Sequence, residues 1–308
     1  MPAFTHRANA IRQDRISRIY TAIVYALIAI LTLVITYPLY FCVIASFSNP
    51  DAVVQGDTIF WFKGFSTTAY SSILKEKLLL SGFKNAMIYM VFGTIYNMAL
   101  TIPAAYVLSK KDLPGGKGLL WFFFLTMYIS GGLIPTYMWY KDLGLVDNPL
   151  VMIIGTGVSA YNMIVARQFF STSIPDTLYE AAEIDGASEL CKFWRIALPL
   201  SKPILAVITL YYAFSKWNSY YTSLIYLRKQ SYWPLQLVLR QLLISSEQMV
   251  SEMATVNSAD PDYLIKRIYL VRSMKYAIIL VSSLPMLILY PFVQKYFTKG
   301  VMVGAIKG

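Results

Sequence analysis

The chain alternates long apolar segments with shorter polar ones. Six apolar segments are each long enough to cross a bilayer as a helix, since about 20 residues suffice. We expect Pro103 to kink the second, and Gly131, Gly132 and Pro135 to unwind or bend the third near its end. The pattern predicts an all-α membrane protein with six transmembrane helices, at 20–46, 85–109, 119–139, 150–170, 201–222 and 275–297.

The two short loops on either side of the third segment differ in charge. Residues 110–118 hold three lysines, whereas Lys141 in 140–149 is opposed by Asp142 and Asp147. Basic residues concentrate in short cytoplasmic loops, so we expect 110–118 inside and 140–149 outside. This topology makes the tails (1–19 and 298–308) and the loop 171–200 cytoplasmic, and the segment 223–274 extracellular.

The long outer segment carries several lysines and arginines, but long loops cross the membrane largely regardless of charge. An apolar stripe at helical spacing predicts an amphipathic helix there, formed by Leu235, Val238, Leu239, Leu242 and Leu243. It either lies at the outer membrane surface or packs on the outer ends of the spans, and we favour packing. Residues 258–261, Ser-Ala-Asp-Pro, predict the start of a helix that runs into the sixth span.

Composition supports a polytopic membrane protein. The 308 residues are 57% hydrophobic and only 14% charged, against about 25% charged in soluble domains. The net charge of +11 does not indicate nucleic-acid binding, because the basic residues flank apolar segments. Cys42 and Cys191 look too separate to form a disulfide, and His6 alone is not a metal site.

The sequence lacks the residues that several classes of protein function require. None of the six apolar segments contains Asp or Glu, which argues against an ion-coupled carrier. There is no HExxH or GxSxG motif, and GGKG at 115–118 lacks the spacing and the Ser/Thr of a phosphate loop. We expect no catalytic residue, no metal and no cofactor bound by this chain.

The most distinctive polar stretch is 180–188, EAAEIDGAS. Pro175 suits a first helical turn, and Leu178, Ala181, Ala182 and Asp185 share one helical face. We expect a glycine at 186 to end this helix and a serine at 188 to cap the next. Spacing alone leaves two interpretations open: a solvated connector, or a helix with a small flat face that docks in another protein's groove.

Polar and aromatic residues gather near the end of the fifth segment. Aromatic faces stack on sugar rings, and amides, hydroxyls and amines bind sugar hydroxyls, so these residues are candidate substrate-pathway groups. The alternative, which we favour on the sequence, is an interfacial aromatic belt with Lys216 reaching outward to water. The candidates are Tyr211, Tyr212, Ser215, Lys216, Trp217 and Asn218, with Asn85, Tyr89, Asn97 and Tyr128 from other segments.

The sequence EAAEIDGASELCKFWRIALPLSKP at 180–203 resembles the EAA loop of permease subunits in binding-protein-dependent ABC importers. The likeness extends over the six spans and the tail at 299–308, and lies within the carbohydrate branch that includes the maltose permease G subunit. The stretch SGGLIPTYMWYKDLGLVDNP at 130–149 resembles oligosaccharide and pectin-fragment permeases in particular. The matching positions in the loop are Glu180, Ala181, Ala182, Asp185, Gly186, Ala187, Phe193, Ile196, Leu198, Pro199 and Pro203.

This resemblance implies a type I importer fold in a bacterial cell membrane. It implies that the helix ending at Gly186 docks on one of two cytoplasmic ATPase subunits, which bind ATP and Mg, and that 300–308 reaches the same interface. It also implies a second, homologous permease subunit that holds most sugar contacts, and an extracellular solute-binding protein that delivers the sugar. The implied coupling residues are Leu178, Glu180, Ala181, Ala182, Asp185, Gly186, Ala187, Phe193 and Pro199.

Two questions stay open at this point. A membrane channel or scaffold without an ATPase would share the composition and the six apolar segments. The basic residues Arg228, Lys229 and Arg240 of the outer segment favour either an acidic sugar such as a uronide or contact with the binding protein.

Overall fold

The computed structural model describes residues 15–253 and 261–305, and every regular element in these ranges is helical. The long helices are α1 (Arg15–Ser46), α4 (Lys77–Ser109), α8 (Ala160–Ser173), α12 (Lys202–Trp217), α14 (Leu235–Met253) and α15 (Pro261–Ala305). The shorter ones are α2 (Pro50–Val54), α3 (Thr68–Lys75), α5 (Gly116–Leu125), α6 (Leu133–Asp142), α7 (Leu150–Ile154), α9 (Asp176–Ile184), α10 (Glu189–Lys192), α11 (Leu198–Leu200) and α13 (Tyr220–Tyr226). The predicted all-α class is confirmed.

Within the described ranges, three single helices are long and apolar enough to cross a membrane: α1, α4 and α15. A fourth span results if α12 is taken with the segment 189–200, to which it is bent by 82°. The third and fourth predicted spans are each divided into two short helices. For the third, the expected break is present, but it begins at Thr126, before the glycines, and α6 starts only after Gly132 with its φ of +86°.

The prediction of one continuous helix over 150–170 is wrong. After α7 the backbone leaves the helix at 155–159 and resumes it in α8. The freed carbonyls find distant side-chain donors: Asn97 donates to the carbonyls of Thr156 and Gly157, and Tyr140 donates to that of Gly155. Such interruptions are tolerated inside a membrane protein where neighbouring helices satisfy the backbone.

Several helix ends differ from the predicted bounds. α1 begins at Arg15 rather than residue 20, and α4 begins at Lys77 rather than 85. Helix α15 includes Pro261 and runs into the sixth span as predicted, while 258–260, where the cap was predicted, lies outside the described residues. α15 continues without a break past 297 to Ala305, so most of the predicted tail 298–308 is helical; residues 306–308 and 1–14 lie outside the described part.

The core lies around α4 and α12. α12 packs against α4 and α15, and α4 also packs against α8 and α14. Leu235, Val238 and Leu239 of α14 are buried against residues such as Leu79 and Ala86 of α4. The predicted amphipathic helix therefore packs on the spans, as favoured.

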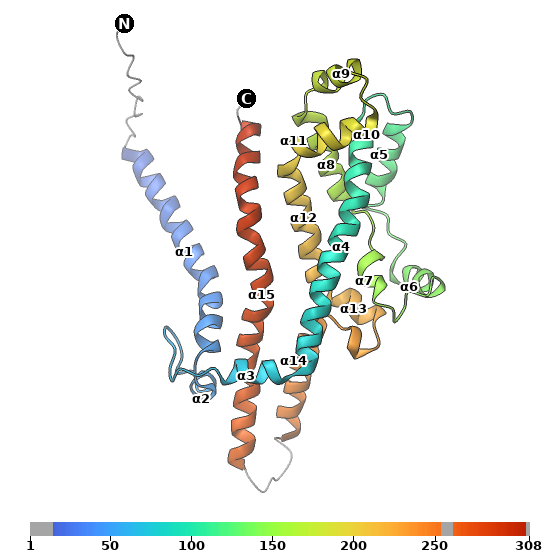
Figure 1. The fold of residues 1–308 in the computed structure, drawn as a ribbon. Helices are drawn as coiled ribbons and strands as arrows, with labels where there is room; N and C mark the ends of the chain where they lie inside the picture. Colours follow the sequence, from blue (N-terminus) through green and yellow to red (C-terminus); the bar gives the residue numbers. More distant parts are fainter. Residues whose placement is uncertain (1–14, 254–260, 306–308) are drawn as a thin grey trace.

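The α9 segment, the beginning of α1 and the end of α15 lie toward the same end of the molecule (Figure 1). At that end, α9 contacts the 110–118 loop, whose Lys111 pairs with Asp176 at 2.6 Å. Away from that end, the 140–149 loop meets the 223–274 segment through Asp147 and Lys229, whose Oδ2 and Nζ are 3.7 Å apart. Two pairs of segments predicted to share a side of the membrane thus contact each other: 110–118 with 171–200, and 140–149 with 223–274.

Candidate functional sites: the α9 segment and the central cavity

The segment 174–200 projects from one end of the helices and contains α9, α10 and α11 (Figure 1). Pro175 precedes α9 as its N-cap in an extended conformation, so the prediction that it lies inside the first turn is wrong by one residue. Asp176 follows in the first turn, where an acidic side chain favours the positive end of the helix dipole. The restricted φ of Pro175 therefore defines the position at which α9 begins.

The predicted glycine stop of α9 is confirmed in detail. Gly186 has a φ of +76°, and its N–H donates to the carbonyl of Glu183. The N–H of Ala187 donates to the carbonyl of Ala182 at 2.9 Å, which completes a Schellman motif. Ser188 then caps α10, because its Oγ accepts a hydrogen bond from the Cys191 N–H at 3.3 Å.

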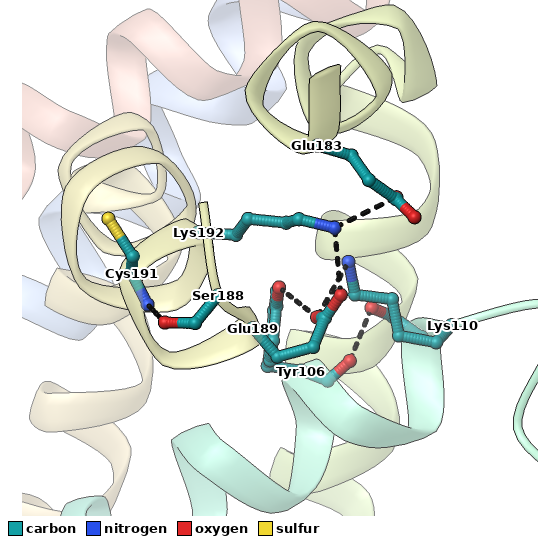
Figure 2. Close-up of polar contacts among 8 residues, drawn as sticks. Tyr106, Lys110, Glu183, Ser188, Glu189, Cys191 and Lys192 are labelled. Atoms are coloured by element: carbon teal, nitrogen blue, oxygen red, sulfur yellow. Dashed lines mark hydrogen bonds and ion pairs between the residues drawn. The ribbon is translucent and has the colours of Figure 1, made fainter. Parts of the chain in front are cut away.

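A charged network joins α9 and α10 to the end of α4 (Figure 2). The Lys192 side chain is only 4% exposed, and its Nζ lies 3.0 Å from Oε2 of Glu183 and 2.9 Å from Oε1 of Glu189. Lys110 and the Tyr106 hydroxyl approach Glu189 at 3.5 and 3.2 Å. The hydrogen bond from Lys192 lowers the pKa of the Glu189 carboxyl, and that to Glu189 raises the pKa of Lys192. The network stays ionised at neutral pH.

An aromatic anchor lies beneath this network. Phe193 is buried, with its ring 5.0 Å from that of Tyr106, and Tyr179 of α9 packs at 6.2 Å from the same ring. Lys110 lies 3.8 Å above the centre of the Tyr179 ring. Burial raises the pKa of the Tyr179 hydroxyl to about 12. Phe193 and Tyr179 therefore hold α9 on the spans, while the rest of the segment faces outward.

The outward surface of α9 differs from the predicted flat face. Leu178, Ala181 and Asp185 are exposed as expected, but Ala182 is half-buried. Ile184 is 89% exposed, and the sequence did not predict it, because it lies neither on the helical face of Leu178 nor among the positions that match the EAA loop. A large apolar residue two positions before a glycine that ends a helix is the sequence signal that could have identified Ile184. Of the remaining predicted coupling residues, Glu180, Gly186 and Pro199 are exposed and Ala187 is half-buried. Leu190 and Trp194 add exposed apolar surface nearby.

A cavity of about 1020 Å³ opens beside α12, with walls from α4, α7, α8, α13 and α15. Six predicted pathway residues line it: Asn97, Tyr211, Tyr212, Ser215, Lys216 and Asn218. Sequence reasoning missed the wall given by α8 and α15, which includes Tyr161, Asn162, Ser283 and Tyr290. No local signal marks these residues, because packing of distant helices brings them to the cavity.

The other predicted pathway residues lie elsewhere. Trp217 is 2% exposed in the core, and its Nε1 donates to the Ser282 carbonyl at 3.1 Å. Tyr128 is 72% exposed in the break after α5 and does not line the cavity. Asn85 and Tyr89 donate to backbone carbonyls between residues 231 and 233, so they fasten α4 to that loop.

Lys216 points inward, so the outward-reaching lysine that we favoured from the sequence is wrong. It is 8% exposed, and its Nζ donates to the carbonyls of Met152 and Ile153 at 2.9 and 3.0 Å. These carbonyls belong to the end of α7, just before the interruption of the fourth span. In the described part of the chain, no cluster of three or more His, Cys, Asp and Glu could hold a metal ion.

Comparison with known proteins agrees with this architecture. Residues 78–303 match the model of the family described as binding-protein-dependent transport system inner membrane component. In Bacillus subtilis, the polygalacturonan/rhamnogalacturonan transport system permease protein YtcP is 36% identical, with 95% of this chain and 99% of YtcP covered. Protein LplC of the same organism is 35% identical, with 88% and 89% covered.

A solved structure is also similar over most of the chain. Its title is "Crystal structure of a bacterial ABC transporter involved in the import of the acidic polysaccharide alginate". It matches with a TM-score of 0.82 and 33% identity, covering 92% of this chain and 99% of the matched one. From the family match and these relatives, the chain belongs to the binding-protein-dependent transport system inner membrane components, the permease subunits of ABC importers.

Proposed function

We propose that this chain forms half of the translocation pathway for an oligosaccharide, and that α9 couples it to a cytoplasmic ATPase. The coupling role rests on one observation: the outer surface of α9 is exposed, while the segment that contains α9 is fixed to the membrane-spanning helices. Leu178, Ala181 and Ile184 offer apolar surface to a partner. Glu189 and Phe193 tie the same segment to Tyr106 of α4, a helix that also lines the cavity.

Such an arrangement can transmit a displacement. A helix that was exposed but loosely tethered would move without pulling on the spans. Here the buried ammonium of Lys192 connects α9 to α10, and the segment 189–200 leads directly into α12. A movement imposed on α9 by closure of an ATPase therefore reaches α12, whose other end forms the cavity wall.

The oligosaccharide assignment is supported by the cavity and by the relatives. The lining residues are rich in hydroxyls, amides and tyrosine rings, which suit sugar hydroxyls and sugar faces. The names of two relatives refer to polysaccharide transport, of polygalacturonan and rhamnogalacturonan in one case and of alginate in the other. The remaining half of the pathway, the ATP- and Mg-binding subunits and the delivering solute-binding protein belong to partner chains. The end that carries α9 faces the cytoplasm in this proposal.

Cysteine cross-linking in the assembled importer tests the coupling role. In a background without Cys42 and Cys191, Ile184→Cys should link to a cysteine introduced on the docking surface of an ATPase subunit, either as a disulfide under mild oxidation or through a short bismaleimide. Lys141→Cys, exposed at the far side of the molecule, is the matched control and should not. Stimulation of ATP hydrolysis by loaded binding protein should be lost once the link forms.

The alternative function gives a different result. A channel or scaffold without an ATPase would co-purify with no ATPase subunit, and its sugar flux would not depend on ATP. Absence of any cross-link from Ile184→Cys in an importer that still hydrolyses ATP would contradict docking through α9.

A further inference from the structure

The cavity contains one charged side chain whose charge nothing in the described chain balances. Lys216 is 8% exposed and lines the cavity wall. Its two contacts are the carbonyls of Met152 and Ile153, at the C-terminal end of α7, where the helix dipole favours a cation. These contacts orient the ammonium, but carbonyl groups carry no net charge.

No carboxylate compensates this lysine within the described residues. The residues that line the cavity include no Asp and no Glu, and no ion pair involves Lys216. Lys229 of the outer segment differs, since it pairs with Asp147 at 3.7 Å. An unpaired charge inside a membrane protein is costly, and such residues usually mark a substrate or ion pathway.

The position of the ammonium is fixed by close packing. A Cβ added to Gly93 of α4 would lie 2.9 Å from both Cδ and Cε of Lys216, so the lysine stem lies directly against a glycine surface. Two of the three ammonium N–H groups have backbone acceptors. The third remains for a group in the cavity, and the stem has little freedom to turn away.

The beginning of α8 adds to the positive potential. Ser159, Tyr161 and Asn162, at the start of this 14-residue helix, line the same cavity as Lys216. Helix N-termini attract anions, because their first N–H groups lack intrahelical partners. The interrupted fourth span therefore presents a helix start and a buried ammonium to one space, surrounded by hydroxyls and amides that suit a sugar.

We propose that Lys216 is a specificity-determining residue that binds a carboxylate of an acidic oligosaccharide as it passes through the cavity. This inference rests on the proposed function and adds the charge of its substrate. The outer-segment basic residues do not carry the argument, since none of Arg228, Lys229 and Arg240 lines this cavity.

The test compares two probes of nearly equal size in the full importer. Vesicles containing the complex take up radiolabelled trigalacturonate or its trimethyl ester, which is uncharged. Lys216→Met should lower uptake of the acid about tenfold or more relative to the ester, as expected from the loss of a charge-assisted hydrogen bond. Lys216→Arg should retain the preference for the acid. The binding protein is the same in every vesicle, so its own selectivity cancels in the comparison of variants.

The possible failures are distinguishable. Uptake in Lys216→Met that falls equally for both probes, with normal assembly, would show a purely structural lysine and overturn this inference. An unchanged acid-to-ester ratio would overturn it as well, while leaving the proposed importer intact. Absence of ATP-dependent uptake of both probes and of neutral trisaccharides by the wild-type complex would overturn the proposed function, and this inference with it.

Discussion

Replacing Gly186 by valine tests the coupling segment most directly. At a φ of +76° an L-residue costs about 1–2 kcal/mol, and β-branching makes valine especially unsuited there. No heavy atom lies within 4 Å of the position of an added Cβ, so the penalty comes from the backbone and not from a clash. The change therefore acts on the end of α9 without displacing a neighbour.

The substitution Gly186→Val should change the structure only at the C-terminal end of α9. α9 has nine residues, and a helix of that length is marginal by itself. A penalty of about 1–2 kcal/mol shifts the balance between the formed and opened helix end by roughly 5- to 30-fold. Because Ile184 and Asp185 precede the glycine directly, loss of the Schellman bonds changes the surface offered to the ATPase. Membrane insertion and the cavity should be unaffected.

The assay is ATP hydrolysis and sugar uptake by the reconstituted importer, with and without loaded binding protein. Gly186→Val should lose most of the stimulation and the uptake, whereas Gly186→Asn should retain much of both, since asparagine tolerates the left-handed region. Gly56→Val is the matched control, because Gly56 has a φ of +81° and equally open surroundings outside the α9 segment. Wild-type stimulation in Gly186→Val, or an equal loss in Gly56→Val, would refute the reasoning.

Three further changes have defined outcomes. Ile184→Ser should weaken ATPase binding about 10- to 100-fold, from the roughly 1.5–3 kcal/mol of one buried isoleucine, and leave the melting temperature of the isolated chain unchanged; unaltered affinity would contradict docking there. Glu189, whose pKa is lowered chiefly by the hydrogen bond from Lys192, stabilises the fold above the usual glutamate pKa of about 4.3 and loses this effect as pH falls through the lowered value. The melting-temperature gap between wild type and Glu189→Gln should therefore narrow as the pH falls below about 4.3, and a gap that stays constant over that fall would count against the network. Gly93→Ala crowds the stem of Lys216 and should reduce trigalacturonate uptake more than ester uptake; equal uptake ratios would show that the stem can yield.

The sequence by itself determined the features that depend on neighbouring residues. The six apolar segments and the low charge content established an all-α membrane protein. The glycine at 186 and the serine at 188 specified the end of one helix and the start of the next, because both effects arise from backbone conformation and local hydrogen bonds. The predicted apolar stripe of α14 specified its buried face in part: Leu235, Val238 and Leu239 are buried, but Leu243 is 44% exposed.

The tertiary structure decided the features that depend on partners far along the chain. The interruption at 155–159 is stabilised by Asn97 and Tyr140, and neither shares a local pattern with that segment. The direction of Lys216 was decided by the carbonyls at the end of α7, which offered the ammonium inward acceptors in place of water. A hydropathy pattern records how apolar a helix is, but a buried charge depends on which acceptors packing brings within 3 Å, and only the folded chain contains that information.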